Sequence, residues 1–447
     1  MNDIRFTKTN GGMGRAAANE DPVSGLLMCL PELAEVDLID TNNTLQFDKI
    51  ENVDGNNPLY VAKLRFPEAL ADYGISEQTV SMSAADYTQG DEADELMKRA
   101  AFNTIVYHVT EFFRMNAEGT LYLSIKIAQS GNIKLCDIVA LQNYAGGSLR
   151  QCGVFTPALS YLENSNTIDI LADYQNACTA LENTHKPMSI IATIPGITVA
   201  VSVNINGVDM DFTPTSVLTV SDFTSISHVL ADRCNVSLLI GCDLDGGTVQ
   251  QLAHYAYYGC IGTCLGAVSK AAVHESISWV QKFPLGLKAP GFISGDLLKD
   301  VSDQNQNLID DNRYIFVRTH VGDADNYFND SHTLDLPTSD YAFIENVRTI
   351  DKACRGVRAN LLPYLNSPLK VDAETGRLDA PTVAFLETTA GKALEDMEKA
   401  GELSGYRAEI DPEQNVLGAS QVEVVIRNVP MGVMRKVHVK IGFNTSL

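Results

Sequence analysis

Short apolar segments alternate with helical patterns through the middle of the chain. Apolar runs occur at GVFTP, MSIIATIPG and NVSLLIGCD, and patterns with helical periodicity cover residues 168–183 and 223–232 between them. Buried strands that alternate with helices are typical of a mostly parallel sheet with helices on both faces. We therefore expect an α/β fold with a central mixed or parallel sheet flanked by helices.

Further elements are expected on both sides of this alternating segment. LYVAKLRF and LYLSIKIA predict strands, and residues 96–115 predict a helix between them. The later helix YGCIGTCLGAVSKAAV is rich in small residues, and Gly262 and Gly266 are four positions apart. Glycines at this spacing allow a helix to pack closely against a sheet. The weakly polar stretch around it is shorter than the roughly 20 residues that span a bilayer, so no transmembrane helix is expected.

The last 110 residues predict two helices followed by two strands. Thr338, Ser339 or Asp340 can cap a helix that runs to about Leu362, where Pro363 ends it. A second helix reaches about Lys399, and QVEVVIRNVP and RKVHVKIGF are strand candidates. The apolar positions of the first helix recur at helical spacing and are expected to face the core: Ile344, Val347, Ile350, Cys354, Val357 and Leu361.

The final strand candidate has no evident partner in the chain. Its apolar positions alternate with His438, Lys440 and Gly442 in the period of a strand with one buried face. An open strand edge of this kind is suited to pairing with another subunit. Those apolar positions are Val437, Val439, Ile441 and Phe443.

The start of the chain shows a similar strand candidate with a glycine-rich segment after it. Ile4, Arg5, Phe6 and Thr7 form the short strand. NGGMGR follows, and its glycines predict a flexible hinge. The hinge glycines are Gly11, Gly12 and Gly14.

Length and charge narrow the classes of function. The 447 residues are enough for two or three domains, and 33 Lys and Arg against 56 Asp and Glu give a net charge of −23. This charge argues against nonspecific binding to nucleic acid or to an anionic membrane. No signal peptide is recognisable, and the 9 cysteines, in mostly apolar contexts, are expected to be reduced and buried.

A basic stripe is predicted on the first C-terminal helix. It consists of four cations in 11 residues, opposed only by Asp351. Two interpretations are open: a solvated basic face, or a face that docks onto an acidic partner. The four residues are Arg348, Lys352, Arg355 and Arg358.

One segment resembles a catalytic motif. NVSLLIGCDLDGGTV is similar to the first motif of haloacid-dehalogenase-type phosphatases. By this resemblance Asp243 would be the nucleophile, Asp245 the general acid and base, and a bound Mg²⁺ would neutralise the charge of the phosphate. The additional Gly247 displaces the hydroxyl of Thr248 from the phosphoryl group, and a polar turn at a strand end explains the segment equally simply. We therefore predict no catalytic, cofactor or metal site and keep an Mg²⁺-dependent phosphohydrolase as the alternative.

The order of the C-terminal segments resembles a known family. IENVRTIDKACRGVRANLLPYL, the turn at Thr375 and Gly376, GELSGYRAEIDPEQNVL and the two final strands are similar to the C-terminal region of contractile tail sheath proteins of phages and related injection particles. NGGMGR followed by DPVSGLL resembles the opening of a bacterial prophage-type branch of that family. The alternating α/β segment is compatible with the middle domain of such proteins.

The resemblance implies a structural, non-enzymatic subunit of a sheath. Sheath subunits form hexameric rings that stack as a helix around an inner tail tube, and terminal arms add strands to the sheets of neighbouring subunits. The sheath contracts once to drive the tube through a cell envelope, without nucleotide hydrolysis. Implied partners are further copies, the inner tube protein, and baseplate and tail terminator proteins, with no nucleic acid and no membrane insertion. Assembly in the bacterial cytoplasm is implied, and another tail or baseplate component is an alternative.

The expected organisation combines both lines of argument. The basic stripe is the candidate contact with the inner tube. We expect a multi-domain sheath-like α/β fold with a C-terminal α+β domain and extended strand arms at both ends. The predicted boundaries are 1–24 for the N-terminal arm and hinge, 25–150 for a first α/β region, 151–335 for the middle domain, 336–432 for the C-terminal domain and 433–447 for the C-terminal arm.

Overall fold

The computed structural model describes eleven stretches of the chain: 21–31, 33–38, 47–50, 58–65, 90–127, 133–155, 170–198, 202–205, 208–211, 218–244 and 256–443. The predicted N-terminal strand of Ile4, Arg5, Phe6 and Thr7 and the hinge at Gly11, Gly12 and Gly14 lie outside these residues. Both therefore stay predictions.

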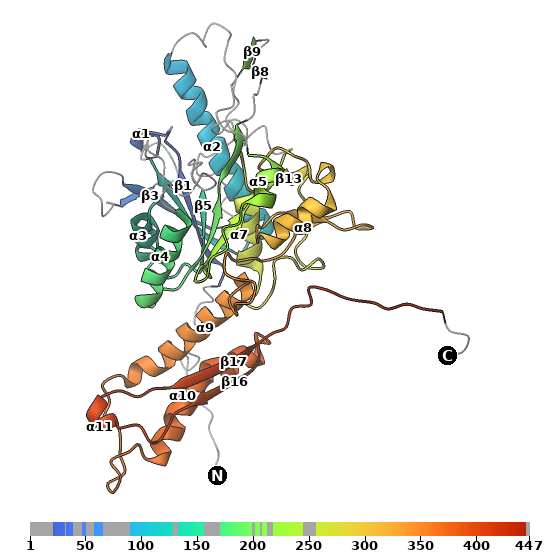
Figure 1. Ribbon diagram of the computed structural model, residues 1–447. Helices are drawn as coiled ribbons and strands as arrows, with labels where there is room; N and C mark the ends of the chain where they lie inside the picture. The colour runs from blue at the N-terminus through green and yellow to red at the C-terminus, as the bar shows by residue number, and fades with distance from the viewer. Residues whose placement is uncertain are drawn as a thin grey trace, which may run out of the picture.

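A seven-stranded mixed sheet forms the centre of the main body (Figure 1). Its order is β10-β6-β5-β1-β4-β3-β2; the first five strands run parallel, and β3 and β2 are added antiparallel at one edge. The predicted α/β architecture with a mixed sheet is confirmed. The strands are β1 (Val23–Cys29), β2 (Asp48–Ile50), β3 (Leu59–Arg65), β4 (Thr120–Lys126), β5 (Gln151–Phe155), β6 (Ser189–Thr193) and β10 (Val236–Leu239).

Helices cover both faces of this sheet. α2 (Gly90–Met115) and α7 (Ile261–Lys270) lie on one face, and α3 (Leu135–Tyr144) and α4 (Ile170–Asn183) lie on the other (Figure 1). Because successive side chains of a strand point to opposite faces, the central strand β1 contributes to two cores. Leu26 and Met28 belong to the core under α2 and α7, whereas Leu27 belongs to the core under α3 and α4. The sheet takes strands from both sides of residue 150.

The glycines of α7 face a helix rather than the sheet. A Cβ atom on Gly262 would lie 2.1 Å from the carbonyl oxygen of His108 in α2, and one on Gly266 would lie 2.7 Å from that of Phe112. The sheet side of α7 is formed by other residues, including Ile261, which lies over Gly153 of β5. The prediction that these glycines approach the sheet is wrong, since their missing side chains let two helix backbones come together.

Shorter elements complete the body. The helix predicted over residues 223–232 starts earlier and has only 6 residues. A capping box between Thr219 and Asp222 marks its start, and the chain is extended again at Ile226. The remaining elements are α1 (Glu35–Leu38), β7 (Pro195–Thr198), β8 (Ser202–Ile205), β9 (Val208–Asp211), α5 (Val220–Ser225), β11 (Gly241–Asp243), β12 (Ala256–Tyr258), β13 (Pro290–Phe292), η3 (Leu298–Asp300), α8 (Asp303–Asp311), β14 (Val317–Thr319) and β15 (Asn326–Phe328).

The C-terminal residues form a separate layered unit below the body in Figure 1. β16 pairs antiparallel with β17, and together with α9 and α10 they enclose a small core around Ala353, Leu394, Met397 and Leu403. The partner of the predicted strand QVEVVIRNVP is thus LSGYRAE, which the sequence did not indicate. The elements are α9 (Ile344–Leu361), η4 (Leu362–Tyr364), α10 (Ala380–Lys399), β16 (Leu403–Glu409), α11 (Val416–Ala419) and β17 (Val425–Pro430).

The start of α9 also differs from the prediction. The helix begins at Ile344, and its N-cap residue Phe343 makes no side-chain cap. Ser339, one of the predicted caps, belongs to turns instead, since its hydroxyl accepts the N–H of Tyr341 and its carbonyl accepts the N–H of Ala342. The cap prediction is therefore wrong by about one helical turn.

Candidate assembly surfaces: the C-terminal arm and the α9–β17 groove

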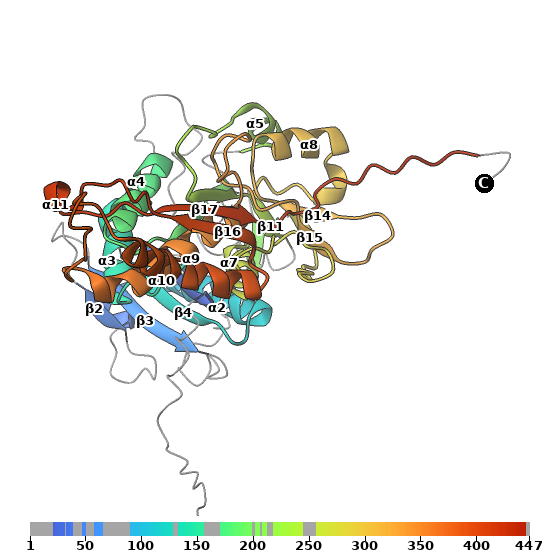
Figure 2. The same ribbon diagram turned by 90° about the horizontal axis from the view of Figure 1, so that it is seen from below.

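The chain leaves β17 as an extended arm, here called the C-terminal arm and covering residues 431–443. Figures 1 and 2 show it running sideways away from the C-terminal unit, and in Figure 2 it starts beside β14. Within the described residues, 436–443 form no backbone pairing with any strand. The predicted strand is therefore extended but unpaired in the single chain, and its pairing with a neighbouring subunit stays a prediction.

The arm exposes the apolar side chains that its alternating pattern singled out. Val437 is 64% exposed, Val439 71% and Ile441 91%, and Phe443 is fully exposed. Soluble monomers rarely expose a contiguous apolar row. Covering four such side chains would contribute roughly 1.5–3 kcal/mol each, before the cost of ordering the arm. The arm is therefore suited to binding a second surface.

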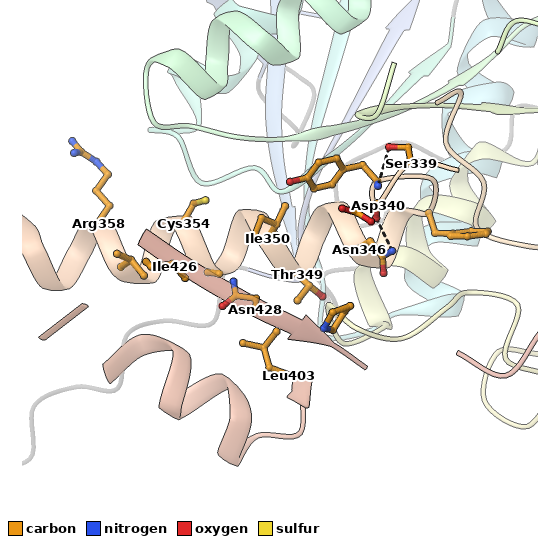
Figure 3. A pocket seen from close by; sticks show the side chains of 15 residues that line it. Ser339, Asp340, Asn346, Thr349, Ile350, Cys354, Arg358, Leu403, Ile426 and Asn428 are labelled. Atoms are coloured by element: carbon orange, nitrogen blue, oxygen red, sulfur yellow. Dashed lines mark hydrogen bonds between the residues drawn. The ribbon is translucent and has the colours of Figure 1, made fainter. Parts of the chain in front are cut away.

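A groove of about 740 Å³ lies between α9 and β17 (Figure 3). Its walls mix apolar side chains with a few polar groups. Within the described residues, the side-chain carbonyl of Asn428 on β17 is buried but accepts no hydrogen bond. β17 pairs only with β16 there, so its second backbone edge is open. The lining includes Asn346, Thr349, Ile350, Cys354, Val357, Leu403, Ile426, Asn428 and Pro430.

The groove accounts for part of the apolar stripe that was expected to face the core. Ile344 and Val347, at the start of α9, are buried as predicted. Ile350, Cys354 and Val357 line the groove instead, and Cys354 is exposed. The core-facing prediction is wrong for Cys354, which is exposed, whereas Val357 lines the groove and also packs against the small core of the C-terminal unit.

The four cations of α9 do not share one exposed face. Arg348 is 4% exposed, and its guanidinium donates to the carbonyls of Ala271 and Ala272 after α7, at 3.1 and 3.3 Å. The expectation of a continuous basic face open to a partner is therefore wrong at Arg348, since this side chain anchors α9 to the body.

Lys352 and Arg355 form ion pairs within the chain. Lys352 donates to Asp21 at 2.7 Å and to Glu402 at 2.6 Å, and Arg355 forms an ion pair with Asp21 at 3.5 Å. Asp21 precedes β1, whereas Glu402 precedes β16. These contacts join the body to the C-terminal unit, and Arg358 is the member of the stripe that is exposed.

Asp351 lies in the same junction and is 8% exposed. Burial raises its pKa to about 7, and Glu182 acts in the same direction, while Arg355 and Arg150 lower it. A carboxyl group whose pKa is higher in the folded state than in the unfolded chain binds more protons when folded. Its contribution to stability is therefore present at low pH and is lost as the pH rises toward and through 7.

Asp351→Asn is expected to stabilise the chain at pH 8 by about 1–2 kcal/mol, because it removes the cost of a buried carboxylate, and to have a smaller effect at pH 5. Urea unfolding at both pH values measures this difference. The exposed Asp396 on α10 provides a control, since Asp396→Asn should change stability equally little at both. A gain from Asp351→Asn that did not depend on pH would contradict the assignment.

The residues of the alternative phosphatase motif are not assembled into a site in the described residues. Asp243 is 7% exposed, and its carboxylate accepts the N–H groups of Lys288 and Ala289 at 3.3 and 2.9 Å. These bonds fit a structural role in holding the loop before β13. Asp245, Gly247 and Thr248 lie outside the described residues, and nothing in the described part favours the phosphohydrolase.

Metal-binding clusters, cysteines and membrane-spanning helices were also considered in the predictions. Within the described residues no group of three or more His, Cys, Asp or Glu side chains could hold a metal ion. All 9 cysteines are free; six are buried as predicted, Cys136 and Cys234 are partly buried, and Cys354 is exposed, contrary to the prediction. Burial raises the pKa of Cys152 to about 12, which keeps that thiol protonated. No helix among the described residues is long and apolar enough to cross a membrane.

Comparison with solved structures gives the fold of the whole chain. A chain of the cryo-EM structure of the anti-feeding prophage (AFP) baseplate, 6-fold symmetrised, is 12% identical with a TM-score of 0.51, over 99% of both chains. A chain of the AFP helical sheath in contracted state is 13% identical with a TM-score of 0.50, over 98% of both chains. The sheath-like fold expected from the C-terminal motifs is thus confirmed.

Sequence comparison identifies the family. No curated protein matches the sequence. The model described as DUF2586, N-terminal domain, matches residues 81–332, and the model described as DUF2586, C-terminal domain, matches residues 340–447. The interval between the two matches falls just before α9, where the body passes into the C-terminal unit. Because the first match alone covers more than half of the sequence, the chain belongs to the DUF2586 family.

Proposed function

We propose that this chain is the structural subunit of a contractile tail sheath, which polymerises as stacked hexameric rings around an inner tube and contracts to drive that tube through a cell envelope. The observation that carries the proposal is the C-terminal arm, whose apolar side chains point into solvent in the single chain. A fold shared with an AFP sheath chain over nearly the whole length supports it. The proposed role is structural, not enzymatic.

Strand exchange is the proposed contact between subunits. The arm of one copy would lie in the α9–β17 groove of another, with its backbone along the open edge of β17 and its apolar side chains against Ile350, Val357 and Ile426. The unpaired carbonyl of Asn428 would gain a donor. Such pairing combines main-chain hydrogen bonds, which give affinity, with side-chain pockets, which give specificity.

Strand exchange also suits a sheath that changes length. Contraction requires subunits to rotate as rigid bodies between two packings while the connections between them persist. An arm that pairs with the neighbour and touches little of its own chain can remain bound during such a rotation. The further proposed partners are the inner tube protein and the baseplate and tail terminator proteins, with assembly in the bacterial cytoplasm.

The basic stripe remains the proposed contact with the inner tube, and within it Arg358 is the residue to test. Reversing all four charges would break the ion pairs of Lys352 and Arg355 and release the buried Arg348, so the unit itself would be disturbed. Arg358 is exposed and projects from α9 at one end of the groove (Figure 3). It is the residue at which a tube contact can be tested separately.

Arg358→Glu is expected to reduce co-sedimentation of sheath with tube severalfold, because charge complementarity would be lost at the tube contact. Sheath formation without tube is measured in parallel, because Arg358 also lines one end of the groove. Arg377→Glu is a matched control, since Arg377 is also exposed and pairs only with the exposed Glu413 among the described residues. Equal co-sedimentation of the two variants and the parent would remove Arg358 from the contact.

Electron microscopy of the purified chain tests the function itself. A sheath subunit is expected to form hollow cylinders, or short stacks of six-membered rings, at high protein concentration. Discrete rings that never stack would favour a baseplate or terminator component instead. A preparation that contains only single particles, in the presence and absence of tube protein, would refute the proposal.

A further inference from the structure

The root of the C-terminal arm is held by one side chain, Arg435, at the point where the arm passes the body. Its guanidinium donates to both carboxylate oxygens of Asp330, at 3.1 and 2.9 Å, and it also forms an ion pair with Glu345. Asp330 follows β15 of the body, whereas Glu345 lies in the first turn of α9. One arginine therefore joins the arm to both units of the chain.

The surroundings of Arg435 make this contact specific. The guanidinium carbon lies 3.5 Å from the ring centre of Phe343, the residue that precedes α9, and Arg313 lies 4.9 Å from the same centre. The hydroxyl of Ser331 donates to the second oxygen of Glu345 at 2.5 Å. The Nε–H of Arg435 is shared between the two oxygens of Asp330, and its Nη2 donates to Glu345. A planar guanidinium that binds two different carboxylates and stacks on a ring has few alternative orientations.

The buried acid makes this arrangement costly to lose. Glu345 is 2% exposed, and burial raises its pKa although Arg435 and Ser331 lower it. A buried carboxylate that loses its cation pays the full cost of desolvation. The cost of leaving Glu345 unpaired therefore opposes the release of Arg435.

The hydrogen bonds and ion pairs of the arm end at Arg435. Within the described part of the chain, residues 436–443 form no hydrogen bond or ion pair, and their side chains are exposed. An extended segment without contacts takes its direction from the last residue that is fixed. The contacts of Arg435 tie that residue to Asp330, which follows β15, and to Glu345 of α9.

We propose that Arg435, with Asp330, Phe343 and Glu345, is a positioning site, here called the arm anchor, which sets the direction in which the C-terminal arm leaves the subunit and so presents it to a neighbouring copy. The first half of this proposal concerns the single chain. The second half, presentation to a neighbour, rests on the proposed function.

Distance measurements in the single chain test the first half. Nitroxide labels are placed at Leu308→Cys, an exposed position on α8, and at Val437→Cys, two residues beyond the anchor. The background replaces by serine the three cysteines that are not buried, Cys136, Cys234 and Cys354. Pulsed electron paramagnetic resonance is expected to give a narrow distance distribution for the parent. Arg435→Gln should broaden it at least twofold, and Arg435→Lys, which retains the charge but not the planar fork, should give an intermediate width.

Arg427→Gln is the matched control, since Arg427 lies on β17 and its ion pair is with Glu409 on the surface. It should leave the width unchanged. A parent distribution that is already broad, or one that Arg435→Gln does not widen, would overturn the arm anchor. Circular dichroism spectra like that of the parent would show that the body is folded in every variant, although Arg435→Gln is expected to lower the unfolding temperature because Glu345 loses its cation.

Assembly kinetics test the second half separately. Arg435→Gln is expected to slow polymerisation at least tenfold and Arg435→Lys less. Arg377→Gln, at an exposed residue away from β17 that pairs with Glu413, should assemble like the parent. A broadened distance distribution with unchanged polymerisation would refute the role in presentation. A parent that forms no polymer would refute the proposed function, whereas the distance measurements would still decide whether the anchor exists.

Discussion

Gly262→Ala is expected to destabilise the folded chain by roughly 3 kcal/mol or more, because overpacking against a backbone cannot be relieved by turning a side chain. The new Cβ would lie 2.1 Å from the carbonyl oxygen of His108, so α7 and α2 would have to separate. His108 is fully buried, and its Nδ1 lies 3.4 Å from the N–H of Gly262. Separation would therefore open the core beneath both helices.

Urea unfolding followed by circular dichroism measures this effect. Gly266→Ala should cost less, since its Cβ would lie 2.7 Å from the nearest atoms of Met115 and Phe112. Gly405→Ala is the control: nothing lies within 4 Å of its Cβ, and a change within about 0.5 kcal/mol is expected. If Gly262→Ala unfolded like this control, the close approach of α7 to α2 would be wrong.

The middle of the fold could be predicted because its strands and helices have distinct sequence patterns. GVFTP, MSIIATIPG and NVSLLIGCD became β5, β6 and β10, and their order along the sheet follows from alternation with helices. β1 was missed although it is the central strand. Its sequence VSGLLMC is buried on both faces and shows no alternation, and it directly follows a segment interpreted as an arm.

The C-terminal unit shows where sequence patterns are insufficient. β16 is half-exposed, and its pattern LSGYRAE, which contains Gly405, gives little period-2 signal. Without it, the strand candidate QVEVVIRNVP had no partner in the prediction. The basic stripe was recognised from spacing alone, but Lys352 binds Asp21, which is 331 positions away in sequence. A helical pattern shows which residues share a face and not which element lies opposite.

Proline substitution in the C-terminal arm is expected to weaken assembly strongly without affecting the folded subunit. Neighbouring residues of a strand direct their N–H groups to opposite edges, so His438→Pro and Val439→Pro remove donors from different sides of the arm. Where the lost N–H faced the acceptor strand, a carbonyl of that strand is left without a donor. This costs about 1–3 kcal/mol for each interface. That corresponds to roughly fivefold to a hundredfold in affinity.

The two positions together report on the geometry of the contact. If the arm lies at the edge of the neighbour's sheet, one proline should abolish polymerisation and the other should be tolerated; if strands flank it on both sides, both should block. His438→Ala and Val439→Thr keep the N–H group and serve as controls. Sedimentation measures assembly, and thermal unfolding should be unchanged throughout, because residues 436–443 form no hydrogen bond within the described chain. Parent-like assembly by both proline variants would exclude strand exchange through this arm, since no extended pairing can form without either set of donors.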